Sequence, residues 1–293
     1  MTRSVYKRNR HLLSLKDRQD VSLMLLKMLH GFCVQNNIRY SLAYGTLIGA
    51  VRHKGFIPWD DDIDVMMLRP DYERFCATFK VEGASLHCHQ NKPDCFIGFA
   101  RICDDVYTNS IKNSWLCGGG HTGVWIDIFP VDNVEDDPVT YDQHYRQMQF
   151  LHGDIYKYRA RLNGIYKTNK LRTNILAAFL TLPPFHQILK KKAIRFVDKY
   201  INEMKRVPFG TTGHYSQLAI PGSGSKNYLD IEWFSDFILL DFEDSKFYVM
   251  KGYDAVLRSA YGDYMQLPPE DQRTPLHEYQ FFYWKGEPGI KYE

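Results

Sequence analysis

Apolar residues in the first third of the chain change from helical to strand spacing. Between residues 15 and 35 they recur every three or four positions, which predicts an amphipathic helix. A run with strand character follows, and a small-residue turn then leads into a short helix and a second strand. The predicted elements are a helix at 15–35, a strand at 38–44, a turn at Gly45, a helix at 46–52 with Gly55 as its exit, a strand at 62–67 and a helix from Pro70 to Phe79.

The rest of the chain alternates between the same two patterns. The predicted elements are strands at 95–102 and 124–129 with a glycine loop at 118–120, helices across 138–206, strands at 215–220 and 237–242 with a turn at 221–225, and a helix at 251–260. Helices and strands that alternate in this way predict an α/β (α+β) fold, with a mixed sheet as core and added helices.

Shifts in composition divide the chain into four parts. We expect a tail at 1–14, a core at 15–135 that carries the candidate catalytic residues, a basic helical insertion at 136–206, and a C-terminal β/α part at 207–293 that completes the site.

The net charge of +3 hides a strongly basic segment. Residues 157–206 hold thirteen Lys or Arg against two acids, a local charge of +11, so the remainder of the chain carries −8. Such a block favours a polyanionic partner or an anionic membrane surface. Because the apolar run at 175–185 lies beside Lys190-Lys-Lys192, we expect peripheral membrane contact through 175–206 and no nucleic-acid partner.

Targeting signals are not evident. The basic start is followed by no apolar run of signal-peptide length, and 175–185 is too short to span a bilayer. Six cysteines lack the spacing of a disulfide framework, which predicts free thiols in a reducing compartment. We therefore expect a cytoplasmic protein that works at the inner face of the membrane.

Acidic residues cluster at the start of the second predicted strand. Asp62 and Asp64 are one apolar residue apart, so on a strand both carboxylates project from the same face. Asp60 shares this parity and is a further candidate ligand, whereas Asp61 faces away. Hard oxygen ligands in this arrangement suit Mg²⁺ or Mn²⁺.

Two charged residues stand in otherwise apolar strands. Asp127 shares a strand face with Trp125 and Phe129, where an uncompensated carboxylate is costly. A metal ion shared with the acidic cluster would offset that cost. Arg101 also lies within an apolar run, where a cation needs a partner.

Five ordered segments resemble the LicD family and the similar fukutin-related transferases. They are Gly45-Thr-Leu-Ile-Gly-Ala-Val-Arg52, Gly55-Phe-Ile-Pro-Trp-Asp-Asp-Asp-Ile-Asp64, Asp71-Tyr-Glu-Arg-Phe75, Trp125-Ile-Asp-Ile-Phe-Pro130 and Tyr261-Gly-Asp-Tyr-Met265. The resemblance covers residues 15–135 well and 251–277 more thinly. It implies a nucleotidyltransferase-like fold and transfer of a phospho-alcohol from a CDP-linked donor to a glycan.

The resemblance also implies roles for individual residues. Gly45 and Thr46 would face the donor phosphates. Asp62, Asp64 and Asp127 would bind the divalent metal and act as the catalytic set, with Asp60 as a further ligand; Asp127 would serve as base or as ligand alone. Arg52, Lys54 and Arg101 would meet the diphosphate.

We therefore predict a metal-dependent enzyme that moves a phospho-alcohol from a CDP-alcohol, with CDP-choline as the leading donor, to a hydroxyl of a cell-surface glycan, with release of CMP. A lipid-linked glycan acceptor would suit the predicted membrane contact. Two alternatives remain: a nucleotidyltransferase that uses an NTP and releases pyrophosphate, and a non-catalytic glycan- or membrane-binding protein of the same fold.

Overall fold

The computed structural model describes five stretches of the 293 residues. These are residues 11–110, 122–162, 182–222, 227–275 and 282–286. The glycine loop expected at 118–120 and most of the turn expected at 221–225 lie outside the described residues.

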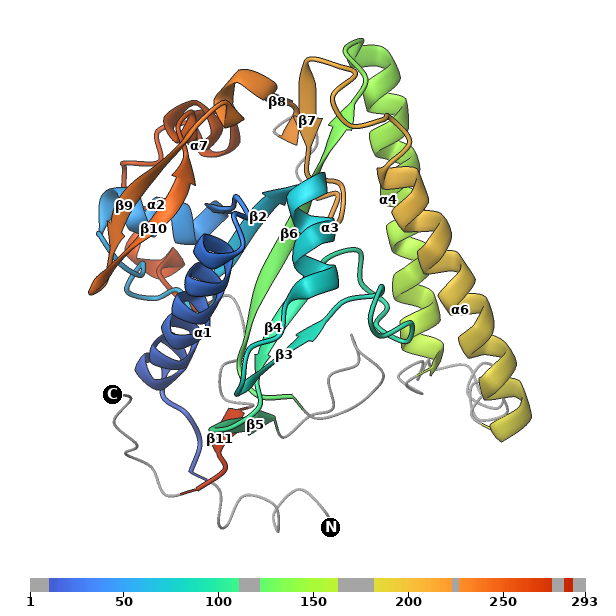
Figure 1. The fold of residues 1–293 in the computed structure, drawn as a ribbon, viewed down its shortest axis with the longest axis horizontal. Coiled ribbons are helices and arrows are strands. Elements are labelled where there is room, and N and C mark those ends of the chain that lie inside the picture. Colours follow the sequence, from blue (N-terminus) through green and yellow to red (C-terminus); the bar gives the residue numbers. More distant parts are fainter. Residues whose placement is uncertain (1–10, 111–121, 163–181, 223–226, 276–281, 287–293) are drawn as a thin grey trace.

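A curled mixed sheet forms the centre of the molecule (Figure 1). Its strand order is β1-β2-β6-β4-β3; the far half of β6 also pairs with β7, and β7 pairs with β8. Only β2 and β6 pair in parallel among these strands. The strands are β1 (Ser41–Leu42), β2 (Asp64–Leu68), β3 (Ala84–His87), β4 (Ala100–Asp104), β6 (Trp125–Val134), β7 (His214–Ser216) and β8 (Leu229–Asp230). The mixed sheet with added helices confirms the predicted α/β class.

Helices cover both faces of this sheet. The face that carries Ile126 and Ile128 packs against α1 (Leu15–Gln35) and α3 (Arg69–Thr78). The opposite face, which carries Phe129, packs against α4 (Pro138–Leu162) and α6 (Pro183–Met204). In Figure 1, α4 and α6 run side by side along one flank of the sheet. The two faces therefore hold two separate apolar clusters.

Helix α1 begins where the sequence predicts, and a capping box fixes its start. The Ser14 side chain accepts a hydrogen bond from the Asp17 backbone, and the Asp17 carboxylate accepts one from the Ser14 backbone. These contacts satisfy backbone groups that have no partner within the helix. The apolar stripe of α1, including Leu25 and Leu29, is fully buried.

The basic helical insertion predicted at 136–206 is helical at Pro138–Leu162 and at Pro183–Met204. Met148 and Leu151 of α4 pack in the same cluster as Ala193 and Val197 of α6. The Tyr200 hydroxyl donates to the Leu218 carbonyl at 2.8 Å and ties α6 to the segment after β7. The basic residues of this segment thus lie on two helices, α4 and α6, that pack against the core.

A hairpin and a helix from the C-terminal part flank the short helix α2 (Tyr44–Arg52). The hairpin consists of β9 (Phe237–Phe242) and β10 (Ser245–Met250), and it is followed by α7 (Tyr253–Tyr261). The Met250 backbone N–H donates to the Ser41 hydroxyl at 3.0 Å, joining β10 to β1. Smaller elements are β5 (Thr108–Ser110), paired with β11 (Phe282–Trp284), and the 3₁₀ turns Ile231–Phe234 and Glu270–Gln272.

Several predicted strands have different bounds. The strand expected at 38–44 is reduced to β1, because α2 already begins at Tyr44. The strand expected at 95–102 is displaced to β4, since the apolar residues at 95–99 pack as a loop against α4 and α6. The strand expected at 215–220 is reduced to β7. Strand β3, with only one short apolar run, was not predicted.

Two further expectations concern cysteines and membranes. Free thiols are found at Cys33, Cys76, Cys88 and Cys103, whereas Cys95 is disulfide-bonded, so the prediction of free thiols throughout is wrong for Cys95. Within the described stretches, no helix is both long enough and apolar enough to cross a bilayer.

Candidate active site

Four strands place a row of polar residues on one face of the sheet. His87 of β3 lies opposite Arg101 of β4, Arg101 lies opposite Asp127 of β6, and Asp127 lies opposite Asp64 of β2. Residues directly opposite each other in paired strands project from the same face. The row therefore runs from a cationic side at β4 to an anionic side at β2.

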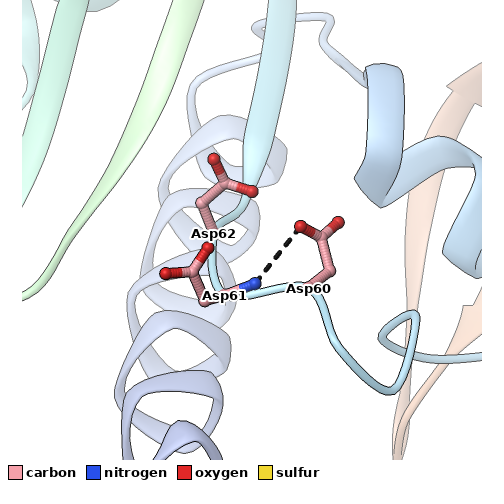
Figure 2. Close-up of side chains that lie close together, drawn as sticks. All are labelled: Asp60, Asp61 and Asp62. Atoms are coloured by element: carbon pink, nitrogen blue, oxygen red, sulfur yellow. Dashed lines mark hydrogen bonds between the residues drawn. The ribbon is translucent and has the colours of Figure 1, made fainter. Parts of the chain in front are cut away.

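The segment before β2 differs from the prediction. Asp62 was expected on the strand with Asp64, but β2 begins at Asp64, and Asp60 to Ile63 are irregular. Side chains of α1 hold this segment in place of a partner strand: Gln19 donates to the Asp60 carbonyl at 2.8 Å. Figure 2 shows Asp60, Asp61 and Asp62 on this turn, with Asp60 and Asp61 pointing to opposite sides.

Asp61 is buried and is held by helix α1. Its carboxylate accepts a hydrogen bond from Arg18 Nη1 at 3.1 Å, and both side chains are almost inaccessible to solvent. Asp61 was expected to face away from the other acids; its carboxylate pairs with Arg18, but one of its oxygens still lies within 4.8 Å of oxygens of Asp60 and Asp62.

The remaining acids lie close enough to repel one another. Burial and then the charges of Asp62, Asp127 and Asp60 raise the pKa of Asp64 well above its usual range. Burial, the charge of Asp62 and a hydrogen bond with it raise the pKa of Asp60 to about 7. Oxygen atoms of Asp60, Asp61 and Asp62 lie within 4.8 Å of one another. Closely spaced hard-oxygen donors, of which Asp60, Asp62 and Asp64 are half-buried, repel each other and fit a divalent cation.

The first turn of α2 adjoins the acids. A Cβ on Gly45 would lie 2.5 Å from Asp60 Oδ2, so only glycine lets that carboxylate approach the helix so closely. No side chain caps this end, and by position the N–H groups of Gly45 and Thr46 have no acceptor within the helix. The N-terminus of α2 is therefore available to an anion.

The Thr46 side chain also has a structural contact. Its side chain is buried, and its hydroxyl accepts a hydrogen bond from the Asp64 backbone N–H at 2.9 Å. Thr46 thus fixes the start of β2 against α2. Its backbone N–H, at the first turn of α2, remains a donor toward phosphate.

Arg101 and Asp127 form a two-pronged ion pair. Arg101 Nε donates to Asp127 Oδ1 at 2.6 Å, and Nη2 donates to Oδ2 at 3.0 Å. The guanidinium centre lies 4.4 Å from the centroid of the Trp125 ring. Within the described part of the chain, Arg101 Nη1 is buried without a hydrogen-bond partner. The pair orients Asp127 and leaves one Arg101 donor for a ligand.

Arg52 and Lys54 are not brought to the acids. Arg52 lies at the far end of α2, about 10 Å along the helix from Gly45, and donates to the Tyr264 carbonyl at 2.6 Å. Lys54 is exposed, with φ 55°, and its carbonyl accepts a hydrogen bond from the Glu243 backbone. The structure therefore offers no contact between either cation and the carboxylates among the described residues.

Two tyrosines that were not expected at the site adjoin its acids. Burial and the charges of Asp64, Asp60 and Asp62 raise the pKa of Tyr261 to about 12, and burial together with Asp64 raises that of Tyr44. Tyr44 adopts φ 47° where β1 turns into α2. Tyr261 opens the last of the segments that suggested the family, which is the signal that could have placed it here.

A mixed α/β sheet with half-buried carboxylates beside an uncapped helix N-terminus suits an enzyme that binds a divalent cation together with an anion such as phosphate. Comparisons agree with this class. A family model described as LicD/FKTN/FKRP, nucleotidyltransferase domain, matches residues 37–161. The lipopolysaccharide cholinephosphotransferase LicD of Haemophilus influenzae is 34% identical over 281 residues, which cover 90% of this chain and 96% of that protein.

A shorter match covers part of the same region. The uncharacterized protein RP689 of Rickettsia prowazekii is 36% identical over 95 residues, or 29% of this chain and 36% of that protein. The chain belongs to the LicD family of phosphotransferases and is an enzyme of the LicD type. The non-catalytic alternative is thereby set aside.

Proposed function

We propose that this enzyme transfers phosphocholine from CDP-choline to a hydroxyl of a lipopolysaccharide-type glycan and releases CMP. The name of the Haemophilus relative, which aligns with 90% of the chain, supports phosphocholine as the group and lipopolysaccharide as the acceptor. The observation that carries the reaction type is the mutual repulsion of Asp60, Asp62, Asp64 and Asp127 beside the α2 N-terminus.

The metal is Mg²⁺ or Mn²⁺ in this proposal. Asp62, Asp64 and Asp127 would hold it, with Asp60 as a further ligand. A divalent cation there would neutralise charge that develops on the donor phosphates as the nucleotide leaves.

The protein's own groups would position the donor. The N–H groups of Gly45 and Thr46 point from the α2 N-terminus toward an anion, and Arg101 offers Nη1 beside Asp127. Both contacts favour a phosphate between α2 and β4. Arg52 and Lys54 would reach the donor only if the nucleotide extends along α2.

A membrane-facing surface would bring the enzyme to a lipid-linked acceptor. The first turns of α6 expose Leu182, Phe185 and Ile188, and the next turns expose Lys191 and Lys192. Apolar residues followed by lysines favour binding to an anionic bilayer surface. Residues 175–181 of the predicted contact region lie outside the described residues. A cytoplasmic location stays a prediction.

Product analysis tests the reaction. Purified protein with Mg²⁺ is incubated with lipopolysaccharide that lacks choline and with CDP-choline or, separately, an NTP. CMP and choline-modified lipopolysaccharide are expected with wild type and absent with Asp62→Asn. Pyrophosphate released from an NTP, with no CMP from CDP-choline, would instead identify a nucleotidyltransferase.

A further inference from the structure

The sheet face that carries the candidate active site also packs against helix α4. Asp127 and Phe129 are two residues apart on β6, so their side chains project from the same face. Phe129 packs in one apolar cluster with Phe99, the residue before β4, and with Ile155 of α4. Helix α4 therefore lies against the face from which the row of polar residues projects.

The last turns of α4 bring a basic residue to this face. Arg159 follows Ile155 by four residues, so the two side chains lie on the same side of the helix. Ile155 is buried in the cluster, and Arg159 is partly buried. Arg161, two residues farther on, lies on the other side of α4 and is exposed. Of these two arginines, Arg159 is therefore the one directed toward the sheet.

The charge of Arg159 is close to that of Arg101. Burial and then the charge of Arg101 lower the pKa of Arg159 to about 10. Two guanidinium groups that lie near each other at a partly buried place repel each other, and an anion between them would relieve the repulsion. Asp127 neutralises one of the two charges through its two hydrogen bonds with Arg101. The three side chains together carry one positive charge in excess.

Arg101 is held in place and has a donor to offer. Its guanidinium centre lies 5.4 Å from the centroid of the Phe99 ring and 4.4 Å from that of Trp125. The residue is 7% exposed, and its Nη1 is buried without a hydrogen-bond partner among the described residues. A buried charged donor without an acceptor is costly, and a phosphate oxygen would satisfy it with a charge-assisted hydrogen bond. The unsatisfied donor and the excess charge thus both favour a phosphate at this place.

We propose that Arg159 of α4 binds a phosphate group of the donor together with Arg101. This inference rests on the proposed function, and it makes the basic helical insertion part of the active site. The phosphate would lie beside Asp127 and so next to the candidate metal ligands. Arginine suits this role because its planar group can donate two parallel hydrogen bonds to one phosphate.

Two arginines of the same helix provide a matched pair of variants. Arg159→Gln removes the charge near Arg101, and Arg161→Gln removes the same charge from the exposed side of α4. Calorimetric titration with CDP and Mg²⁺ should give a Kd about tenfold higher for Arg159→Gln, equal to about 1.4 kcal/mol, and an unchanged Kd for Arg161→Gln. The KM for CDP-choline should rise by the same factor in Arg159→Gln.

Two further measurements separate loss of the phosphate contact from loss of structure. Without nucleotide, Arg159→Gln should be at least as stable to urea as wild type, because it relieves the repulsion from Arg101. Arg159→Lys keeps the charge but not the planar fork, and it should recover part of the affinity for CDP. Equal Kd values for CDP in wild type and Arg159→Gln would overturn the proposal.

The outcomes also separate this inference from the proposed function. If wild type releases CMP from CDP-choline and Arg159→Gln keeps its KM, the assignment of Arg159 is wrong and the function stands. A raised KM for lipopolysaccharide with an unchanged KM for CDP-choline would overturn it as well, because Arg159 would then meet a phosphate of the acceptor. If wild type does not use CDP-choline, the function fails, and titration with Mg²⁺ and inorganic pyrophosphate decides the inference. Weaker binding to Arg159→Gln than to wild type would support it, and equal or absent binding would overturn it.

Discussion

Arg18 of α1 and Asp61 form an ion pair that is closed off from solvent, with Nη1 and Oδ2 3.1 Å apart. The pair joins the first helix to the turn that carries the candidate metal ligands on either side of Asp61. Because Gln19 of the same helix holds the Asp60 carbonyl, α1 fixes the backbone of the acidic segment. Asp61 is thus a structural residue between two candidate catalytic ones.

The first prediction contrasts two neighbouring aspartates. Asp61→Asn leaves the Arg18 charge buried without its anion, which should cost about 3–5 kcal/mol of unfolding free energy. Asp62→Asn removes a charge that repels Asp60 and Asp64, so stability should be equal or higher while turnover is lost. Denaturant unfolding and CMP release on the same preparations give both quantities.

Each of the two variants has an outcome that would contradict this prediction. A stable Asp61→Asn protein would mean that the Arg18 charge finds another partner or solvent, and the structural role would be wrong. Full turnover by Asp62→Asn would remove the metal proposal for that residue.

The second prediction concerns the close approach of Asp60 to α2. In Gly45→Ala the new Cβ must displace the Asp60 carboxylate, which it would otherwise meet at 2.5 Å. We expect kcat/KM to fall by about an order of magnitude with little change in Tm, since alanine favours the helix by about 0.5–1 kcal/mol. Gly31→Ala is the matched control, because its Cβ in α1 meets nothing within 4 Å. It should keep full activity, and unchanged activity in Gly45→Ala would contradict the role of this contact.

The sequence predicts the elements that periodicity encodes. Helix α1 matches its predicted bounds, since a capping box and a regular apolar stripe both mark it. Strand β1 was overestimated, because an apolar run does not reveal that Tyr44 turns with φ 47° into α2. The chain at 95–99 is equally apolar, yet it is buried as a loop by contacts with α4 and α6 that local pattern does not contain.

In the candidate site, too, the sequence indicated some residues and not the residues that contact them. The acids were found because their spacing and their surroundings conflict with an ordinary core. The partners of those residues were not found: Arg18 and Gln19 look like the polar side of a helix, and Arg101 was expected to meet phosphate although it holds Asp127. These contacts span up to 43 residues of sequence. They follow from tertiary packing, which one sequence does not display.

The third prediction is a pH dependence of stability that comes from His87. Burial, followed by the charges of Lys92 and Arg101, lowers the pKa of His87 to about 4, against the opposing charges of Asp105 and Asp94. Between about pH 6.5 and pH 4 the unfolded chain therefore binds a proton that the folded protein does not. In this window the unfolding free energy should fall on acidification, by at most about 1.4 kcal/mol per pH unit from this group.

Comparison with a variant isolates that contribution. His87→Gln lacks the titrating ring, so its unfolding free energy should decline less steeply than that of wild type between pH 6.5 and pH 4. Urea unfolding at several pH values measures both slopes. His11→Gln is the control, because this histidine is exposed. If the unfolding free energies of wild type and His87→Gln decline equally with pH, His87 binds its proton over the same pH range in the folded and the unfolded protein, and the prediction is wrong.

The fourth prediction concerns the exposed lysines of α6. Lys190 is engaged with Asp94 at 3.0 Å, so Lys191 and Lys192 are the residues available to an anionic surface. Each lysine near such a surface contributes about 1 kcal/mol, and replacing both by glutamine should weaken binding to phosphatidylglycerol vesicles by roughly thirtyfold. Sedimentation with vesicles measures the partition coefficient. The matched variant Lys80→Gln/Lys251→Gln removes the same charge from other exposed positions and should bind like wild type. If both double variants bind equally, the attraction comes from net charge and α6 does not face the membrane.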